Sequence, residues 1–284
     1  MTLREALAAG RERLRRAQIE DRDPDVWYLL EEAAGVGRAA YFMNPDREMT
    51  KKEVLRYEEM LERRARHVPL QYILGKQEFM GLEFLVSDAV LIPRQDTEIL
   101  VCEILKESKG CSVLDVCTGS GCIIISLVRL GGVTRAVACD ISEPALNLAK
   151  ENAKRLGAEV EFLQGDLMEP VTGRFDIIVS NPPYIASGEI EGLMPEVRDY
   201  EPRLALDGSE DGLVFYRRIL AQAGEHLSAR GRIWFEIGCD QAEAVSGLLL
   251  EHGYHDIRVI QDYSGLDRVV CGARSESVLE EAYV

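Results

Sequence analysis

The chain has 284 residues, of which 46% are hydrophobic and 29% charged, a composition that suits a globular protein of one large domain plus a smaller one. Asp and Glu outnumber Lys and Arg by 49 to 33, and the resulting net charge of −16 weighs against a double-stranded DNA substrate, whose binding relies on neutralised phosphates. No apolar run approaches the roughly 20 residues that span a bilayer, and the polar start Met1–Ala6 lacks the apolar core of a signal peptide, so we expect no membrane association and a cytoplasmic location.

The beginning of the chain, residues 2 to about 74, is predicted to be helical. Leu3, Leu7 and Leu14 form one apolar stripe at helical spacing. Thr50 followed by Glu53 is typical of a capping box that starts a further helix. The basic run 63–67 is most simply a solvated helix end, and its alternative is a face that contacts a partner.

A change of pattern follows these helices. Residues 79–92 have the pattern of short strands, and Met80-Gly81 indicates a turn between them, so a β-hairpin linking two domains is predicted. Pro93 then interrupts the chain, and a helix is expected over about 96–106.

From Cys111 onward, strands and helices alternate. The expected strands are 113–116, 136–139, 160–163, 176–180, 232–237, 257–260 and 268–271, and the expected helices are 123–130, 144–156, 213–227 and 241–252. This alternation is typical of a mostly parallel sheet with helices on both faces. The sequence therefore predicts an α/β fold with three regions: an N-terminal helical domain over 1–74, a hairpin linker over 75–93 and a second domain over 94–284.

Cysteine and histidine provide little for metal binding or nucleophilic catalysis. The seven cysteines are scattered through apolar segments without a C-x-x-C pair, and only four histidines occur. We expect buried reduced thiols, no metal site and no Ser-His triad.

The turn after the first strand of the second domain has the residues of a ligand-binding loop. Small residues follow Val116 before the next helix: Cys117, Thr118, Gly119, Ser120 and Gly121. Such a turn at the carboxyl end of a strand lets a ligand approach the backbone N–H groups of the helix start. Gly119 and Gly121 are expected because a Cβ there would occupy ligand space.

Two acids follow at the ends of the next strands. Asp140 lies about 20 residues past the loop, where a carboxylate can accept both ribose hydroxyl hydrogens, and Asp166 with Leu167 can meet an adenine ring. Either acid has the alternative of capping a helix. Ile124 stands where a dinucleotide fingerprint needs glycine, and no phosphate-binding P-loop occurs. A ligand with adenosine but no phosphates fits best, which points to S-adenosylmethionine.

The most informative segment is the strand that ends in Asn181-Pro182-Pro183-Tyr184. The two prolines stiffen the loop and leave carbonyls that accept hydrogen bonds. The Asn181 oxygen and the Pro182 carbonyl can together accept both hydrogens of one –NH₂ group, and Tyr184 can stack on its flat face. Holding both N–H groups favours the tetrahedral nitrogen of a methyl-transfer transition state, so no strong general base is required.

These four residues leave the acceptor open. Adenine N6 in nucleic acid and a glutamine side chain in protein both present a flat –NH₂ group. A third hypothesis is a binding module that keeps the fold without catalysis, and the intact loop together with Asn181 disfavours it.

The whole chain, beyond these motifs, resembles the release factor glutamine N5-methyltransferases, the PrmC/HemK family. The resemblance covers roughly residues 65–272, and its similar stretches are 68–75, 79–84, 91–98, the loop around Asp115, 181–184, 201–208 and 235–238. It implies a seven-stranded methyltransferase fold with a small N-terminal helical domain that contacts the release factor. It also implies the substrate, the glutamine of the Gly-Gly-Gln loop in class 1 peptide-chain release factors, and the product S-adenosylhomocysteine.

The resemblance also assigns roles to site residues. Asn181 and the Pro182 carbonyl would hold the glutamine amide with Pro183 and Tyr184 around it. The donor would contact the loop 117–121, Asp140, Asp166, Leu167 and Asn181. Two positions depart from the family pattern: Cys117 replaces the first loop glycine and is small enough to keep the turn if its φ is negative, and Gln95 replaces a frequent proline. The resemblance leaves Arg94 open between an ion pair at the domain junction and a contact to donor or release factor.

Overall fold

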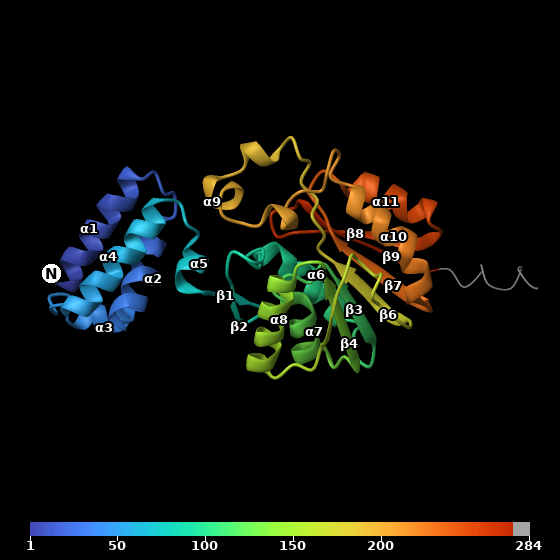
Figure 1. Ribbon diagram of the computed structural model, residues 1–284, viewed down its shortest axis with the longest axis horizontal. Helices are drawn as coiled ribbons and strands as arrows, with labels where there is room; N and C mark the ends of the chain where they lie inside the picture. The colour runs from blue at the N-terminus through green and yellow to red at the C-terminus, as the bar shows by residue number, and fades with distance from the viewer. Residues whose placement is uncertain (275–284) are drawn as a thin grey trace, which may run out of the picture. The chain divides into compact units, whose positions relative to one another are not determined.

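The computed structural model describes residues 1–274 and divides them into two compact units (Figure 1). One consists of Met1–Lys76 together with Met194–Tyr200, and the other of Gln77–Leu193 together with the residues from Glu201 onward. No helix within 1–274 is long and apolar enough to cross a membrane.

The first unit is helical, as expected. Its helices are α1 (Leu3–Arg16), α2 (Arg22–Ala34), α3 (Arg38–Met43), α4 (Lys51–Ala65), α5 (Leu70–Leu74) and the short α9 (Pro195–Arg198). The predicted capping box of Thr50 and Glu53 starts α4, and a second one, Thr2 with Glu5, starts α1. The apolar stripe of Leu3, Leu7 and Leu14 is buried in the core between the helices.

A buried charge cluster connects α9 to this helical core. The Arg64 guanidinium donates to the Asp25 carboxylate at 2.6 Å and to the Glu196 carboxylate at 3.1 Å. The His67 ring also contacts Glu196, and the Tyr200 hydroxyl donates to the Arg66 carbonyl. Arg64, His67 and Arg66 therefore each bind a residue of 194–200, which joins this segment to the helical unit.

The predicted hairpin forms, with its turn at the expected residues. It consists of β1 (Lys76–Phe79) and β2 (Leu82–Leu85), and both Met80 and Gly81 have positive φ in the turn. The expected strand pattern to residue 92 was wrong beyond Leu85, because 86–94 contain no strand and run as loop and turns to the next helix.

The larger unit is built on one seven-stranded sheet of order β5-β4-β3-β6-β7-β9-β8. Its strands are β3 (Ser112–Val116), β4 (Arg135–Asp140), β5 (Glu161–Gln164), β6 (Phe175–Ser180), β7 (Leu227–Glu236), β8 (Tyr254–Gln261) and β9 (Asp267–Arg274). All pairs are parallel except the two made by β9. The predicted fold class is confirmed.

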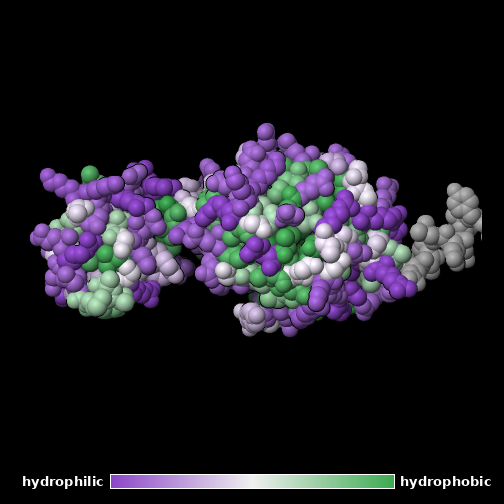
Figure 2. Space-filling view, turned by 90° about the horizontal axis from the view of Figure 1, so that it is seen from below, coloured by the Kyte–Doolittle hydropathy of each residue, from purple (hydrophilic) through white to green (hydrophobic). Residues whose placement is uncertain are grey.

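Helices cover both faces of this sheet, because successive strand residues point to opposite sides. Val113 packs with α6 (Gln95–Leu105), α7 (Cys122–Gly131) and α8 (Glu143–Leu156), whereas its neighbour Leu114 packs with α10 (Val214–His226) and α11 (Ala242–Glu251). The two groups of helices lie on opposite sides of the sheet in Figure 1. Figure 2 shows a largely hydrophilic surface, with apolar residues gathered on the larger unit.

The strand order determines where ligands can bind. The chain runs from β3 outward to β5 and then returns to the other side of β3 as β6. In open α/β sheets a ligand crevice lies outside the carboxyl ends of the strands at such a reversal. Asp140 ends its strand at this edge, and the predicted loop 117–121, Asp166 and Asn181 follow the ends of theirs.

Candidate active site

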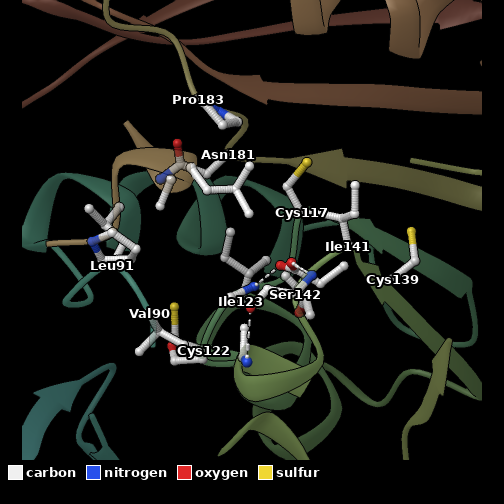
Figure 3. Close-up of a pocket in the computed structure, with 18 of the residues that line it drawn as sticks. Val90, Leu91, Cys117, Cys122, Ile123, Cys139, Ile141, Ser142, Asn181 and Pro183 are labelled. Atoms are coloured by element: carbon white, nitrogen blue, oxygen red, sulfur yellow. Dashed lines mark hydrogen bonds between the residues drawn. The ribbon is translucent and has the colours of Figure 1, made fainter. Parts of the chain in front are cut away.

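A cavity of about 290 Å³ opens at this edge of the larger unit. Its wall is drawn in Figure 3, where Asn181, Cys117 and Ser142 surround the same space. The lining residues that the sequence had indicated are Cys117, Thr118, Gly119, Ser120, Asp140, Asp166, Leu167, Asn181 and Pro183.

The loop after β3 is held by a buried carboxylate. The Thr118 hydroxyl donates to Asp115 Oδ2 at 2.6 Å, and the Thr118 N–H donates to the Cys139 carbonyl of β4 at 3.1 Å. Burial raises the pKa of Asp115 to about 7, opposed by the Thr118 hydrogen bond. Asp115 Oδ1 is buried without a hydrogen-bond partner within residues 1–274.

The two loop glycines are needed for different reasons. Both have positive φ, +55° at Gly119 and +79° at Gly121. A Cβ on Gly119 would meet no atom within 4 Å, so the absence of a side chain leaves open space at the cavity, as expected. A Cβ on Gly121 would lie 2.8 Å from Ile125 Cδ1 and 3.2 Å from Ala149 Cβ, so the expected ligand clearance was wrong for Gly121. That glycine allows α7 and α8 to pack closely.

Cys117 has a left-handed backbone. Its φ is +63°, so the condition of a negative φ, under which a cysteine would fit this turn easily, is not met. The left-handed region costs a residue with a Cβ roughly 1–2 kcal/mol relative to glycine. The turn from β3 into α7 therefore imposes a glycine-type conformation on a cysteine that also lines the cavity.

Asp140 connects two backbone segments of the cavity wall. Its Oδ2 accepts from the Gly119 N–H and its Oδ1 from the Ser142 N–H, both at 2.9 Å. The alternative that Asp140 caps α8 was wrong, because the Ser142 side chain is the N-cap and accepts from the Ala145 N–H. Burial raises the pKa of Asp140, although these N–H donors favour its ionised form. Each oxygen retains a lone pair for a further donor.

Asp166 and Leu167 form another section of the wall. Leu167 is buried and has φ +53°, and the Asp166 carboxylate accepts from the Arg218 guanidinium at 2.6 Å. Residues 167–170 after Asp166 form turns, so no helix begins there for Asp166 to cap. Arg218 and Phe215 of α10 also line the cavity.

Of the four residues that follow β6, only some line the cavity. Asn181 and Pro183 line it, whereas Pro182 and Tyr184 are not among its lining residues. Tyr184 packs against the hydrophobic core, and its hydroxyl lies 3.4 Å from Glu236 Oε1. The Asn181 Nδ2 donates to the Thr97 hydroxyl of α6 at 3.4 Å.

Arg94 forms an ion pair inside the larger unit. Its guanidinium contacts the buried Glu201 carboxylate, and Arg94 is also one of the residues that line the cavity. Burial raises the pKa of Glu201, and the Arg94 charge opposes that rise.

Two family models match the chain. The PrmC N-terminal domain matches residues 5–75, and the Methyltransferase small domain matches residues 95–195. Proteins named release factor glutamine methyltransferase are similar over nearly their full length. The one from Geobacter sulfurreducens is 44% identical over 95% of this chain and 96% of its own. The one from Moorella thermoacetica is 42% identical over 97% of this chain and 100% of its own.

The chain belongs to the release factor glutamine methyltransferase family. The predicted resemblance is thereby confirmed, and so is the expectation of a methyltransferase. A crystal structure of a methyltransferase from Pyrococcus furiosus shares the fold, with a TM-score of 0.55 at 18% identity, covering 69% of this chain and 91% of that one.

In this member of the release factor glutamine methyltransferase family, sequence reasoning missed several residues of the cavity. Val90 and Leu91 precede α6, and Phe215 and Arg218 lie on α10, all far in sequence from the loop 117–121. Their residue types are ordinary for a loop or an amphipathic helix. Only the packing of α6 and α10 at the sheet edge brings them to the site.

The left-handed backbone at Cys117 predicts an order of stability for two substitutions. Cys117→Gly should have a free energy of unfolding about 1 kcal/mol higher than Cys117→Ala, because both remove the thiol and only glycine adopts this φ without strain. Urea denaturation of the two variants measures the difference. Ala221, exposed within α10, is the control. There Ala→Gly should destabilise by about 1 kcal/mol. Equal stability of the two Cys117 variants would show that the left-handed backbone does not strain a residue with a Cβ at this position.

The raised pKa of Asp115 predicts a pH effect on stability. Its folded pKa of about 7 exceeds the unfolded value near 4, so the folded state holds the extra proton between them. The contribution of Asp115 to stability therefore falls as pH rises from about 4 to about 7. The free energy of unfolding of the wild type minus that of Asp115→Asn should decline over this range and level off above it. A difference independent of pH would show that Asp115 titrates normally.

Proposed function

We propose that the chain transfers the methyl group of S-adenosylmethionine to the side-chain N5 of the glutamine in the Gly-Gly-Gln loop of class 1 release factors. The observation that carries this proposal is that Asn181 lines the same cavity as the Thr118–Gly119 turn and Asp140. One wall offers a clamp for a planar –NH₂ group, and the other offers the contacts of an adenosine-bearing donor.

The donor side suits an adenosine without phosphates. Asp140 would accept the ribose hydroxyls with the lone pairs that Gly119 and Ser142 leave free. Asp166 and the buried Leu167 would meet the adenine, and the loop residues 117–120 together with Asn181 would face the methionine end. The Arg218 guanidinium on this side is paired with the Asp166 carboxylate, an arrangement that suits a ligand without phosphates.

The acceptor side suits an amide nitrogen. The donor's sulfonium supplies the leaving group, and the chain's own task is to orient the amide nitrogen in line with it. Asn181 Oδ1 and the Pro182 carbonyl would accept the two amide hydrogens, with Pro183 and Tyr184 shaping the surroundings. This hydrogen bonding favours the developing tetrahedral nitrogen and needs no base of high pKa.

Glutamine is favoured over adenine by the family and by charge. The relatives at about 40% identity are named for release factor glutamine, and the net charge of −16 is unfavourable for nucleic acid. We further propose that the helical region 1–74 contacts the release factor, that 75–93 is a linker and that 94–284 carries catalysis. Such a substrate places the reaction in the cytoplasm.

The proposed function predicts a defined product. Incubating the purified chain with a class 1 release factor and methyl-labelled S-adenosylmethionine should add one methyl group to the glutamine of the Gly-Gly-Gln loop. Peptide mass spectrometry locates it, and a release factor with that glutamine changed to alanine is the control. If the label appeared in DNA or in another protein's glutamine while the release factor stayed unmodified, the proposed acceptor would be wrong.

Substitutions on the two walls of the cavity should have different effects on turnover and on donor affinity. Asn181→Ala should reduce turnover about 100-fold or more and leave donor affinity within about twofold, because Asn181 mainly serves the acceptor. Asp140→Ala should weaken donor binding about tenfold or more by removing a charged acceptor. Isothermal titration and turnover are measured together. Asp176→Ala, an acid at the opposite end of β6, is the control. An equal fall in donor affinity in both cavity variants would refute the division.

A further inference from the structure

We propose that Gln241 is a positioning residue for the methyl transfer: its side chain holds the Tyr184 carbonyl and thereby fixes the acceptor clamp of Asn181 and Pro182. The inference rests on the proposed function and deepens it. Gln241 lies between the end of β7 and the start of α11 and is not among the residues that line the cavity. It therefore acts on the substrate only through the loop that it holds.

Backbone groups fix the orientation of the Gln241 side-chain amide. Its Oε1 accepts a hydrogen bond from the Gly238 N–H at 3.0 Å. Its Nε2 donates to the Tyr184 carbonyl at 3.0 Å and to the Gly212 carbonyl at 3.4 Å. A backbone N–H can only donate and a backbone carbonyl can only accept, so these partners fit one of the two flipped positions of the amide and exclude the other.

The backbone that follows the acceptor clamp is also closely packed. A Cβ on Gly208 would lie 2.8 Å from Tyr184 Cα, and a Cβ on Gly212 would lie 2.3 Å from the Tyr184 carbonyl oxygen. The Ile185 N–H donates to the Leu206 carbonyl at 3.0 Å, and the Ile185 carbonyl accepts from the Gly208 N–H at 2.7 Å. Two glycines thus allow the approach that brings the Tyr184 carbonyl within reach of the Gln241 amide.

A stiff loop transmits this anchoring to the clamp. Pro182 and Pro183 have fixed φ and no N–H, so they offer no backbone donor of their own to hold the loop. At the beginning of the loop, the Ser180 hydroxyl donates to the Val116 carbonyl at 2.6 Å. The Gln241 contact holds the other end. A shift of that end would turn the Pro182 carbonyl, because the two prolines have little rotational freedom to absorb it.

The direction of the Pro182 carbonyl matters in the proposed reaction. The acceptor amide has two hydrogens, and the Asn181 oxygen and the Pro182 carbonyl would accept one each. A misplacement of about 1 Å can cost about 100-fold in rate. The methyl donor would contact the loop residues 117–120 and Asp140, which belong to other strand ends. Loss of the Gln241 contact should therefore lower turnover and spare the affinity for the methyl donor.

Turnover on a release factor at different pH values gives the first test. Gln241→Glu keeps the side-chain shape and the oxygen that faces Gly238, and places an ionisable oxygen where the –NH₂ group faced Tyr184. The new carboxyl donates to that carbonyl while protonated and repels it once ionised, and burial together with two facing carbonyls disfavours ionisation. The kcat of the variant divided by that of the wild type should be near one at about pH 5 and at least tenfold lower at about pH 9.

The wild type, measured at each pH, corrects for other ionisations. The titratable groups on the elements around Gln241 are common to both enzymes and belong to Tyr184, Asp211, Tyr216, Glu236 and Asp240. Affinity for S-adenosylmethionine, measured by titration, should stay within about twofold of the wild type at every pH, because the residues proposed to bind it are unchanged.

Two further variants serve as comparisons. Gln241→Met removes the hydrogen bonds without adding an ionisable group, so its kcat should be about tenfold below that of the wild type at every pH. Gln261→Glu is the matched control. Gln261 is an exposed residue of β8 whose Nε2 donates to Asp267 Oδ1 at 3.0 Å, and the kcat ratio of this variant should stay near one throughout.

A second measurement reads the Tyr184 carbonyl directly and needs no acceptor. The sequence contains two Tyr-Ile pairs, Tyr72-Ile73 and Tyr184-Ile185. Tyrosine labelled with ¹³C at the carbonyl and isoleucine labelled with ¹⁵N therefore give two carbonyl–amide signals in NMR spectra, and Ile73→Val removes one of them. Gln241→Met should shift the Tyr184 carbonyl signal upfield, because this carbonyl loses a hydrogen-bond donor, and should leave the Tyr72 signal in place.

The outcomes distinguish the inference from the proposed function. If the wild type leaves the release factor unmodified, the proposed function fails, while the carbonyl signal still decides whether Gln241 holds Tyr184. An unshifted Tyr184 signal in Gln241→Met overturns the inference. So does a Gln241→Glu ratio that does not depend on pH, an unchanged kcat in Gln241→Met, or a loss of methyl-donor affinity that parallels the loss of kcat.

Discussion

The parallel pairing of β3 with both β4 and β6 is the constraint on which the rest of the site depends. In register, Val116 lies beside Cys139 on one side and Ser180 on the other, so three strands end together at one edge of the sheet. The residues that follow these ends are neighbours in space although they are up to 64 positions apart in the chain. A slip of one residue in either pairing would turn the side chains to the opposite faces and disperse the site.

The same edge concentrates buried polar groups whose hydrogen bonds determine orientation. Asp115 accepts a hydrogen bond from the Thr118 hydroxyl, and Asp140 accepts from the N–H groups of Gly119 and Ser142. Buried carboxyls of this kind are costly without partners, because burial disfavours their charge. Burial removes water from these carboxyls and so raises their pKa values. Hydrogen bonds to a loop or side chain at the cavity replace the lost water. These contacts fix the positions of groups along the wall, and fixed positions favour catalysis by orientation.

Much of the fold followed from local patterns. The capping box at Thr50, the turn at Met80-Gly81 and the alternation after Cys111 each depend on neighbouring residues, and the structure confirms each of them. Predictions failed where the packing of distant segments overrode a local sequence preference. The strand pattern ended at Leu85, and Gly121 proved to serve helix packing. Cys117 adopted a positive φ because the turn from β3 to α7 outweighs the preference of one side chain.

The sequence by itself determined which functional groups are available to the site: a small-residue loop, an acid for a ribose and an asparagine beside two prolines. These are properties of residue types at strand ends, and strand ends are recognisable from short-range patterns. Only the tertiary structure decided which groups meet. Thr97 and Asn181, which are in contact, lie 84 positions apart in the chain, and no local pattern relates them. They come together because α6 packs on the sheet whose neighbouring strands β6 and β7 end at the same edge, and long-range packing of that kind is set by the whole core.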